Sequence, residues 1–136
     1  MFLRFPREVR YSDNGGSLTV LESTNIPFTV RRLYWIIGIT PEEPRGFHAH
    51  KNLNQVMTVM EGTVELKLRR GESEFSFRIN DQDQHIFIPQ GTWREIYSIS
   101  QRASILVVAD CEYLEEDYIR NWNDYINWFS ENFNEG

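Results

Sequence analysis

Two histidines separated by one alanine, His48 and His50, are the residues of this chain best suited to chemistry. They lie in residues 45–62 (RGFHAHKNLNQVMTVMEG), whose second half is mostly apolar. On an extended strand, residues two apart project to the same side, so we expect both imidazoles to enter one space. Imidazole titrates near neutral pH and can accept and return a proton. The pair therefore predicts a site for proton transfer.

The spacing around the histidines resembles the first sequence motif of the cupin superfamily, which places two histidines and a carboxylate before a closing glycine. Gln55 stands at the carboxylate position and Gly62 at the closing glycine, whereas the opening glycine, expected near Glu42, is missing. Residues 89–94 (PQGTWR) resemble the second motif, because they contain its Pro-x-Gly turn. The histidine that the superfamily has in this motif would fall at Arg94.

These two departures argue against a bound metal. The usual cupin metal site needs three histidines and a glutamate, but this chain has Gln55 and Arg94 at two of those positions. A guanidinium stays protonated, offers only donors, and would repel a cation held by His48 and His50. Two histidines and an amide form a weak site. We therefore expect no metal and no other cofactor.

A histidine pair without a metal can remove a proton from a carbon next to a carbonyl. A neighbouring cation such as Arg94 or Arg45 could stabilise the enediolate that results. This combination is typical of an isomerase or an epimerase.

Arginines and aromatic residues on the neighbouring strands point to a nucleotide-linked sugar. Guanidinium groups match phosphate oxygens, and aromatic rings stack on a base or a sugar. Arg31 and Arg32 must face opposite sides of a strand, and Arg32 is favoured as the inward one because it shares a face with Tyr34. The residues expected to bind substrate are Arg32, Tyr34, Arg45, Gln55, Trp93 and Arg94.

Two of these expectations concern how a single side chain is used. Gln55 is expected to hydrogen-bond a histidine and hold its tautomer, rather than to act directly. The third histidine, His85, is expected at the surface, outside the site.

Three parts of the chain resemble the dTDP-sugar 3,4-ketoisomerases of the cupin superfamily. They are residues 45–51 (RGFHAHK) with Gln55, the turn at residues 89–93 and the segment 117–120 (DYIR). The similarity runs from about residue 30 to about residue 129. The resemblance implies conversion of dTDP-4-keto-6-deoxyglucose to a dTDP-3-keto-6-deoxyhexose, by proton transfer through an enediol. It also implies that both histidines act without a metal and that the protein is a homodimer with shared strands. Such products feed dTDP-amino-sugar synthesis for surface glycans such as lipopolysaccharide.

The residues leave several alternatives open. His48 is assigned as the carbon base and His50 as the partner that moves or orients the hydroxyl proton, but the two roles could be reversed. The C4 configuration of the product, galacto or gluco, is also open. The rival functions are a sugar-nucleotide epimerase of the cupin group, a non-catalytic nucleotide-sugar-binding module and a metal-dependent oxygenase; Gln55 and Arg94 speak against the last of these.

The elements that must position these residues are mostly short strands. Residues 28–39 are aromatic and β-branched, residues 64–68 alternate apolar and charged side chains, and residues 103–109 are apolar throughout, as expected of a strand buried on both sides. Turns are expected at Gly62 and at residues 70–72. Many short strands favour a closed or sandwiched antiparallel β fold. The resemblance to the cupins implies more: an all-β cupin (jelly-roll) β-barrel of about residues 17–110 within a single domain, residues 1–136.

The tail changes to a helical period. Aromatic residues recur there every three or four positions, which predicts one apolar face of a C-terminal α-helix over about residues 117–133. They are Tyr118, Trp122, Tyr125, Phe129 and Phe133. Asp117 could cap its start. This aromatic stripe is expected to pack against the barrel or a second subunit.

Composition limits the remaining classes of protein. The chain has 136 residues, 40% of them hydrophobic and 25% charged, as expected of one soluble globular domain. Its net charge of −6 argues against nucleic acid as a general partner. A single cysteine, Cys111, allows no internal disulfide, and no segment is long and apolar enough for a signal peptide or a membrane span. We expect a cytoplasmic protein that binds no membrane.

Overall fold

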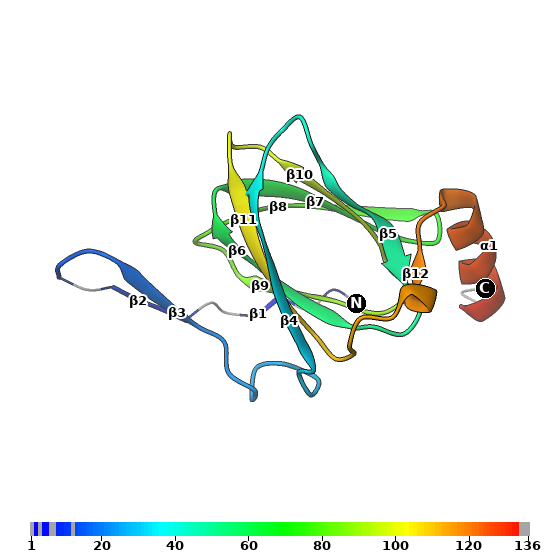
Figure 1. Cartoon of the computed structure of the whole chain (residues 1–136), viewed down its shortest axis with the longest axis horizontal. Coiled ribbons are helices and arrows are strands. Elements are labelled where there is room, and N and C mark those ends of the chain that lie inside the picture. The colour runs from blue at the N-terminus through cyan, green and yellow to red at the C-terminus, as the bar shows by residue number, and fades with distance from the viewer. Residues whose placement is uncertain (1, 3, 6–7, 12, 134–136) are drawn as a thin grey trace.

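The computed structural model describes residues 2, 4–5, 8–11 and 13–133. Two five-stranded antiparallel sheets face each other and enclose the main core (Figure 1). The first sheet has the order β1 (Arg4–Phe5), β9 (His85–Ile88), β6 (Gln55–Glu61), β11 (Ala103–Ala109) and β4 (Arg32–Ile39). The second has the order β12 (Tyr118–Ile119), β5 (Arg45–His50), β10 (Trp93–Ser98), β7 (Thr63–Arg70) and β8 (Ser73–Asn80).

The chain passes back and forth between these sheets, so that β4, β6, β9 and β11 lie in one and β5, β7, β10 and β12 in the other. This crossing pattern is a jelly roll, and it confirms the all-β class predicted from the sequence. The two sheets form a sandwich rather than one continuous ring of paired strands. As a consequence, the pocket described below lies between a strand of one sheet and strands of the other.

Alternation along the strands produces the core. In β7, Val64, Leu66 and Leu68 are buried while the residues between them are half-buried. They meet Ile105 and Val107 of β11 from the opposite sheet, and burial of such side chains stabilises by about 1.5–3 kcal/mol each. The apolar composition of residues 103–109 correctly predicted a strand that is buried along nearly its whole length.

Gly62, the closing glycine of the first motif, occupies the tight turn between β6 and β7. Its φ is +80°, a left-handed conformation that L side chains rarely adopt. A Cβ there would lie 2.3 Å from the carbonyl oxygen of Arg102 and 2.4 Å from Ser100 Oγ. The turn therefore requires glycine for both its conformation and its close contact with the loop before β11.

The C-terminal helix α1 (Trp122–Asn132) covers one end of the sandwich (Figure 1). It starts later than the sequence period predicts, and Asp117 does not cap it: Asn121 is the N-cap and accepts a hydrogen bond from the backbone N–H of Asp124. Residues before it form a 3-10 turn, Glu115–Asp117, followed by β12. The prediction was wrong here because Tyr118 pairs with β5 instead of continuing the helical stripe.

The remaining aromatic residues of the stripe form a second, smaller core between α1 and the second sheet. Its buried members are Ala49, Trp93, Ile119, Tyr125 and Phe129. The prediction that the aromatic stripe packs is therefore correct for the helical part.

The hairpin of β2 (Glu8–Tyr11) and β3 (Ser17–Val20) projects from the sandwich on the side away from α1 (Figure 1). In the part of the chain that the structure describes, no helix has both the length and the apolar character needed to cross a membrane.

Candidate active site

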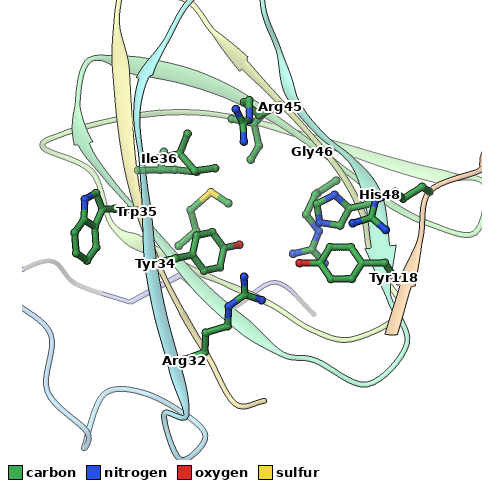
Figure 2. Close-up of a pocket in the computed structure, with 13 residues that line it drawn as sticks. Arg32, Tyr34, Trp35, Ile36, Arg45, Gly46, His48 and Tyr118 are labelled. Carbon is green, nitrogen blue, oxygen red and sulfur yellow. The ribbon is translucent and has the colours of Figure 1, made fainter. Parts of the chain in front are cut away.

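A pocket of about 460 Å³ opens between β4 of the first sheet and β5 and β12 of the second. Figure 2 shows Arg32 and Tyr34 on one wall and His48 and Tyr118 on the other, with the two tyrosine hydroxyls directed toward each other. Apolar side chains, among them Ile36, line the rest together with arginines. A concave space that combines apolar walls with a few convergent polar groups is typical of a small-molecule site.

A bulge in β5 aims His48 into this pocket. Gly46 and Phe47 have φ angles of 92° and 59°, and the pairing of β5 with β10 slips at this point. A Cβ on Gly46 would lie 2.9 Å from the carbonyl oxygen of Arg94, so the close approach of the two strands requires glycine. The bulge explains why a glycine and a distorted residue come directly before the first histidine.

The two histidines meet as the sequence spacing predicts. The ring centroids of His48 and His50 are 4.9 Å apart, and the rings are nearly perpendicular. His48 lines the pocket and is half-buried, whereas His50 is completely buried behind it. Both belong to β5, and they differ in what holds them.

A buried carboxylate, that of Asp117, holds His50. Asp117 Oδ2 is 2.9 Å from His50 Nδ1, and Asp117 Oδ1 accepts a 2.6 Å hydrogen bond from the backbone N–H of Asn52. Because a carboxylate only accepts, the proton of neutral His50 must lie on Nδ1. Its Nε2 is buried, and no described residue forms a hydrogen bond with it. His50 therefore keeps a buried, unprotonated Nε2, and its ring lies beside that of His48.

Burial and a neighbouring positive charge keep both imidazoles neutral. Desolvation is the largest cause and the charge of Arg94 the second; together they lower the pKa of His48 from 6.5 to about 3, although a hydrogen bond with the Gly46 backbone acts in the opposite direction. The same two causes lower the pKa of His50 below its ordinary value. At neutral pH both rings are in the form that accepts a proton.

Tyr118 completes the wall around the histidines. It pairs with His50 across β12 and β5, and its ring centroid lies 4.4 Å from that of His50 and 5.0 Å from that of His48. Neither Asp117 nor Tyr118 was identified as a site residue from the sequence, because the tail period assigned both to the helix. Their only signal was membership of the segment 117–120, which belongs to the family resemblance.

On the opposite wall, a buried chain of hydrogen bonds ends at Tyr34. Arg94, 2% exposed, donates to Gln55 Oε1 and to the carbonyl oxygen of Thr92. Gln55 Nε2 in turn donates to the Tyr34 hydroxyl at 2.9 Å. The expectation that Gln55 bonds a histidine was therefore wrong: Asp117 holds the histidine, and Gln55 holds the tyrosine.

Positive charge gathers at the pocket. Arg32, Arg45 and Arg94 line it as predicted, and Arg120 joins them from the residue after β12. The Arg32 guanidinium lies 4.7 Å from the centre of the Tyr34 ring, and that of Arg120 lies 4.2 Å from the centre of the Tyr118 ring. Burial lowers the pKa of Arg94 to about 10, so it remains a cation at neutral pH. Such a site suits an anionic ligand.

Two predictions about single residues do not match their positions. Trp93 does not line the pocket; it packs in the second core against Trp122 and Tyr125, with ring centroids 5.3 Å and 5.7 Å away. The next residue of β10, Arg94, takes the inward side instead, because neighbours on a strand face opposite ways. His85 is not at the surface: it is buried, with Nδ1 2.7 Å from Thr58 Oγ1.

The residues at the usual cupin metal position do not fit a cation. Gln55 turns its oxygen to Arg94, His50 Nδ1 is bound to Asp117, and a guanidinium stands where a third imidazole would be. Among the described residues, no cluster of three or more histidine, cysteine, aspartate or glutamate side chains is arranged to hold a metal. The same groups are well arranged to move protons next to an anion.

Comparison with known proteins identifies the family. The profile described as FdtA: WxcM-like, C-terminal, matches residues 2–130. A TDP-4-oxo-6-deoxy-alpha-D-glucose-3,4-oxoisomerase from Aneurinibacillus thermoaerophilus is 34% identical over 114 residues, which are 83% of this chain and 82% of the relative.

Solved structures agree with this match. A 3,4-ketoisomerase from Helicobacter canadensis superposes with a TM-score of 0.87 at 34% identity, covering 95% of this chain and 97% of its own. The sugar 3,4-ketoisomerase QdtA from Thermoanaerobacterium thermosaccharolyticum, in complex with TDP, gives 0.87 at 31% identity, with 97% and 96% covered. A 4-keto-6-deoxy sugar epimerase from Streptomyces spheroides, at 12% identity and 0.74, shares the fold alone. The chain therefore belongs to the FdtA family (WxcM-like, C-terminal), which confirms the resemblance to the dTDP-sugar 3,4-ketoisomerases.

Proposed function

We propose that this protein is a sugar 3,4-ketoisomerase that converts dTDP-4-keto-6-deoxyglucose to a dTDP-3-keto-6-deoxyhexose. The observation that carries the proposal is a neutral histidine, His48, facing a polar pocket beside a second histidine that a carboxylate orients. The substrate comes from the relatives, since the curated one is named for a TDP-4-oxo-6-deoxyglucose and a variant of QdtA was crystallised with TDP-4-keto-6-deoxyglucose.

The reaction follows from the arrangement of bases and donors. The hydrogen on C3 is acidic because C3 adjoins the C4 ketone. His48 takes this proton, the C3–H electrons form a C3–C4 double bond, and the ketone oxygen at C4 gains a proton to give an enediol. Loss of the C3 hydroxyl proton and delivery of a proton to C4 leave the ketone at C3, so that no atom or electron is gained or lost overall.

Within this proposal each residue has a role that its position supports. His48 is the carbon base, since it lines the pocket, and His50 is its partner in moving the hydroxyl proton. Arg94 and the arginines at the pocket wall stabilise the enediolate and the diphosphate. Trp93 has no role in binding here, because its ring lies in the second core.

A proton NMR time course with dTDP-4-keto-6-deoxyglucose in D2O, without added metal, tests the proposal. We expect the ketone to move to C3 and deuterium to appear at C4. Deuterium at C3 or C5 with the ketone still at C4 would instead identify an epimerase. A substrate that remains unchanged over hours while dTDP binds would identify a non-catalytic binding module.

The variant His48→Asn tests the base. Asparagine keeps a polar side chain of similar reach but cannot take a proton, so turnover should fall by at least about 100-fold. The affinity for dTDP, measured by calorimetry, should stay close to that of the wild type. Normal turnover in this variant would remove His48 from the mechanism.

A homodimer belongs to the same proposal. The outer face of β4, an edge strand, exposes Leu33, Trp35 and Ile37 at 53%, 56% and 61%. A run of large exposed apolar residues on a sheet edge favours association with a second copy. A cytoplasmic location is part of the proposal too, since the chain has one cysteine and uses no internal disulfide.

A further inference from the structure

The hydrogen bonds that join Arg94, Gln55 and Tyr34 have a direction that the residue types impose. A guanidinium has only donors, so the group that it meets on Gln55 must be the amide oxygen. The amide nitrogen is then left for the tyrosine, and an amide nitrogen only donates. The phenol oxygen accepts this bond, and its own hydrogen must therefore point elsewhere.

The direction left for that hydrogen is the pocket. Figure 2 shows the Tyr34 hydroxyl directed into the space between β4 and the wall that carries His48 and Tyr118. The cation–π contact of Arg32 is made with the Tyr34 ring, so it does not use the hydroxyl hydrogen. The tyrosine is thus prepared to donate to an oxygen of a bound ligand.

We infer that Gln55 is a positioning residue that forms a hydrogen-bond relay between the buried Arg94 and Tyr34. Its amide oxygen accepts from Arg94 and its amide nitrogen donates to Tyr34. The relay leaves the Tyr34 hydroxyl to donate a hydrogen bond to the sugar's ketone oxygen. This inference rests on the proposed ketoisomerase function. It explains the departure from the cupin pattern at this position, where an amide stands in place of a carboxylate.

A carboxylate in the same place would reverse the last bond. Both oxygens of a glutamate accept, so a glutamate would still satisfy Arg94 but would attract the Tyr34 hydrogen away from the pocket. The ketone oxygen would then lose its donor at the step in which negative charge develops on it. Only an amide pairs with a guanidinium on one side and donates to a phenol on the other.

The decisive variant is Gln55→Glu, which keeps the shape of the side chain and its bond to Arg94. We expect kcat for the 3,4-isomerisation to fall by about 100-fold, as when one donor to a developing oxyanion is removed, while KM changes by less than about threefold. The same exchange at an exposed position, Gln101→Glu, is the matched control and should leave both constants unchanged. Wild-type kcat in Gln55→Glu would overturn the inference.

A double-mutant cycle separates positioning from a general structural effect. If Gln55 acts through the Tyr34 hydroxyl, then adding Gln55→Glu to Tyr34→Phe should lower kcat by less than about twofold beyond Tyr34→Phe alone. If the factors by which the two substitutions lower kcat multiply in the double variant, the relay is contradicted. Should Gln55→Glu not fold, Gln55→Met serves in the same cycle, with a smaller loss of kcat expected because the hydroxyl is left undirected rather than captured.

A measurement without substrate keeps this inference apart from the proposed function. The 13Cζ resonance of Tyr34, assigned by its loss in Tyr34→Phe, reports ionisation of the hydroxyl. In the wild type, the hydrogen bond from Gln55 favours the phenolate and lowers the pKa of Tyr34, although burial raises it overall. In Gln55→Glu the pKa should rise by at least about one unit; no rise would overturn the relay. Absence of wild-type turnover would overturn only the proposed function.

Discussion

Arg94 influences both histidines of the site. It is a buried cation beside two bases, and its charge adds to desolvation in lowering the pKa of both histidines. A positive charge at this place has two effects that support each other. It keeps the imidazoles unprotonated before reaction, and it attracts the negative charge that forms on the sugar oxygen during reaction.

The low pKa of His48 predicts an unusual pH profile. A base must be neutral to act, and a folded-state pKa of about 3 means that His48 stays neutral far below the ordinary histidine value of 6.5. We therefore expect kcat/KM, which reports the free enzyme, to stay level from about pH 8 down to about pH 5. The measurement is the initial rate over this range. Loss of activity centred near pH 6.5 would show either that the pKa of His48 is not lowered or that His48 is not the base.

Arg94→Met provides the comparison for this profile. Removing the charge removes one of the two main causes that lower the pKa of His48. The fall of kcat/KM at acidic pH should therefore move upward from about pH 3 toward 6.5. Burial still holds it below 6.5. A fall that does not move would exclude the charge of Arg94 as a cause.

Asp117 fixes the tautomer of His50, and Asp117→Asn should reverse it. The asparagine oxygen can keep the bond from the Asn52 backbone, and its NH2 group would then donate to His50 Nδ1. This moves the histidine proton to Nε2, the nitrogen that is unprotonated in the wild type. We expect kcat to fall on the order of 100-fold with little change in melting temperature, since a misplaced tautomer is costly to catalysis.

The control for this variant is Glu116→Gln, which removes the same charge from an exposed neighbour and should leave kcat unchanged. The 15N shifts of the His50 ring report the tautomer directly. If those shifts match the wild type in Asp117→Asn, the carboxylate does not set the tautomer.

At the scale of elements, the two-residue strand β12 and the helix after it support the site. β12 brings Tyr118 opposite His50, and the backbone carbonyl of Asp117 accepts from Lys51 at 2.9 Å. The helix then anchors this segment through Tyr125. Its hydroxyl accepts from the backbone N–H of Gly71 at 3.0 Å and lies 2.9 Å and 2.8 Å from the carbonyl oxygens of Arg69 and Gly91. One side chain thus joins the helix to the β7–β8 hairpin and to the Pro-x-Gly turn.

Tyr125→Phe should therefore destabilise the fold more than loss of a surface hydroxyl would. It leaves a buried backbone N–H without its partner, which costs about 1–3 kcal/mol. Chemical denaturation measures the free energy of unfolding. Tyr113→Phe, at an exposed tyrosine, is the control and should change it by less than about 0.5 kcal/mol. Equal effects of the two variants would mean that α1 is not anchored in this way.

At the scale of the whole molecule, the two faces of β4 differ in their surroundings. Arg32 and Tyr34 point into the pocket, whereas Leu33, Trp35 and Ile37 are exposed on the outer side, and Figure 2 shows the Trp35 ring turned away from the cavity. A second copy packed on the outer face would support the strand that carries half of the active site. In the proposed homodimer, association and activity would be linked through this one strand.

Trp35→Asp tests this link. A carboxylate in the centre of the apolar face should convert the proposed homodimer to a monomer of 16.2 kDa in sedimentation, because burying an unpaired charge is unfavourable. Trp35→Phe, which keeps an aromatic surface, should remain a dimer. A Trp35→Asp protein that still sediments as a dimer would place the interface elsewhere.

Local pattern was sufficient for much of this protein. The alternation in residues 64–68 predicted β7, and the spacing of His48 and His50 predicted that both rings lie on one side of a strand. The placement of Arg32 and Tyr34 in the pocket followed from the same rule of alternation. Each of these inferences depends on residues within a few positions of one another, where backbone geometry alone decides which side chains share a face.

Tertiary structure decided which groups those side chains bind. Asp117 lies 67 positions from His50, and Gln55 lies 21 from Tyr34, so no local period connects them. The tail period assigned Tyr118 to a helix, but pairing with β5 placed it in the pocket. The sequence by itself determined the jelly roll and the histidine pair. The fold alone determined their partners, because a hydrogen bond depends on which distant strands come within about 3 Å of each other.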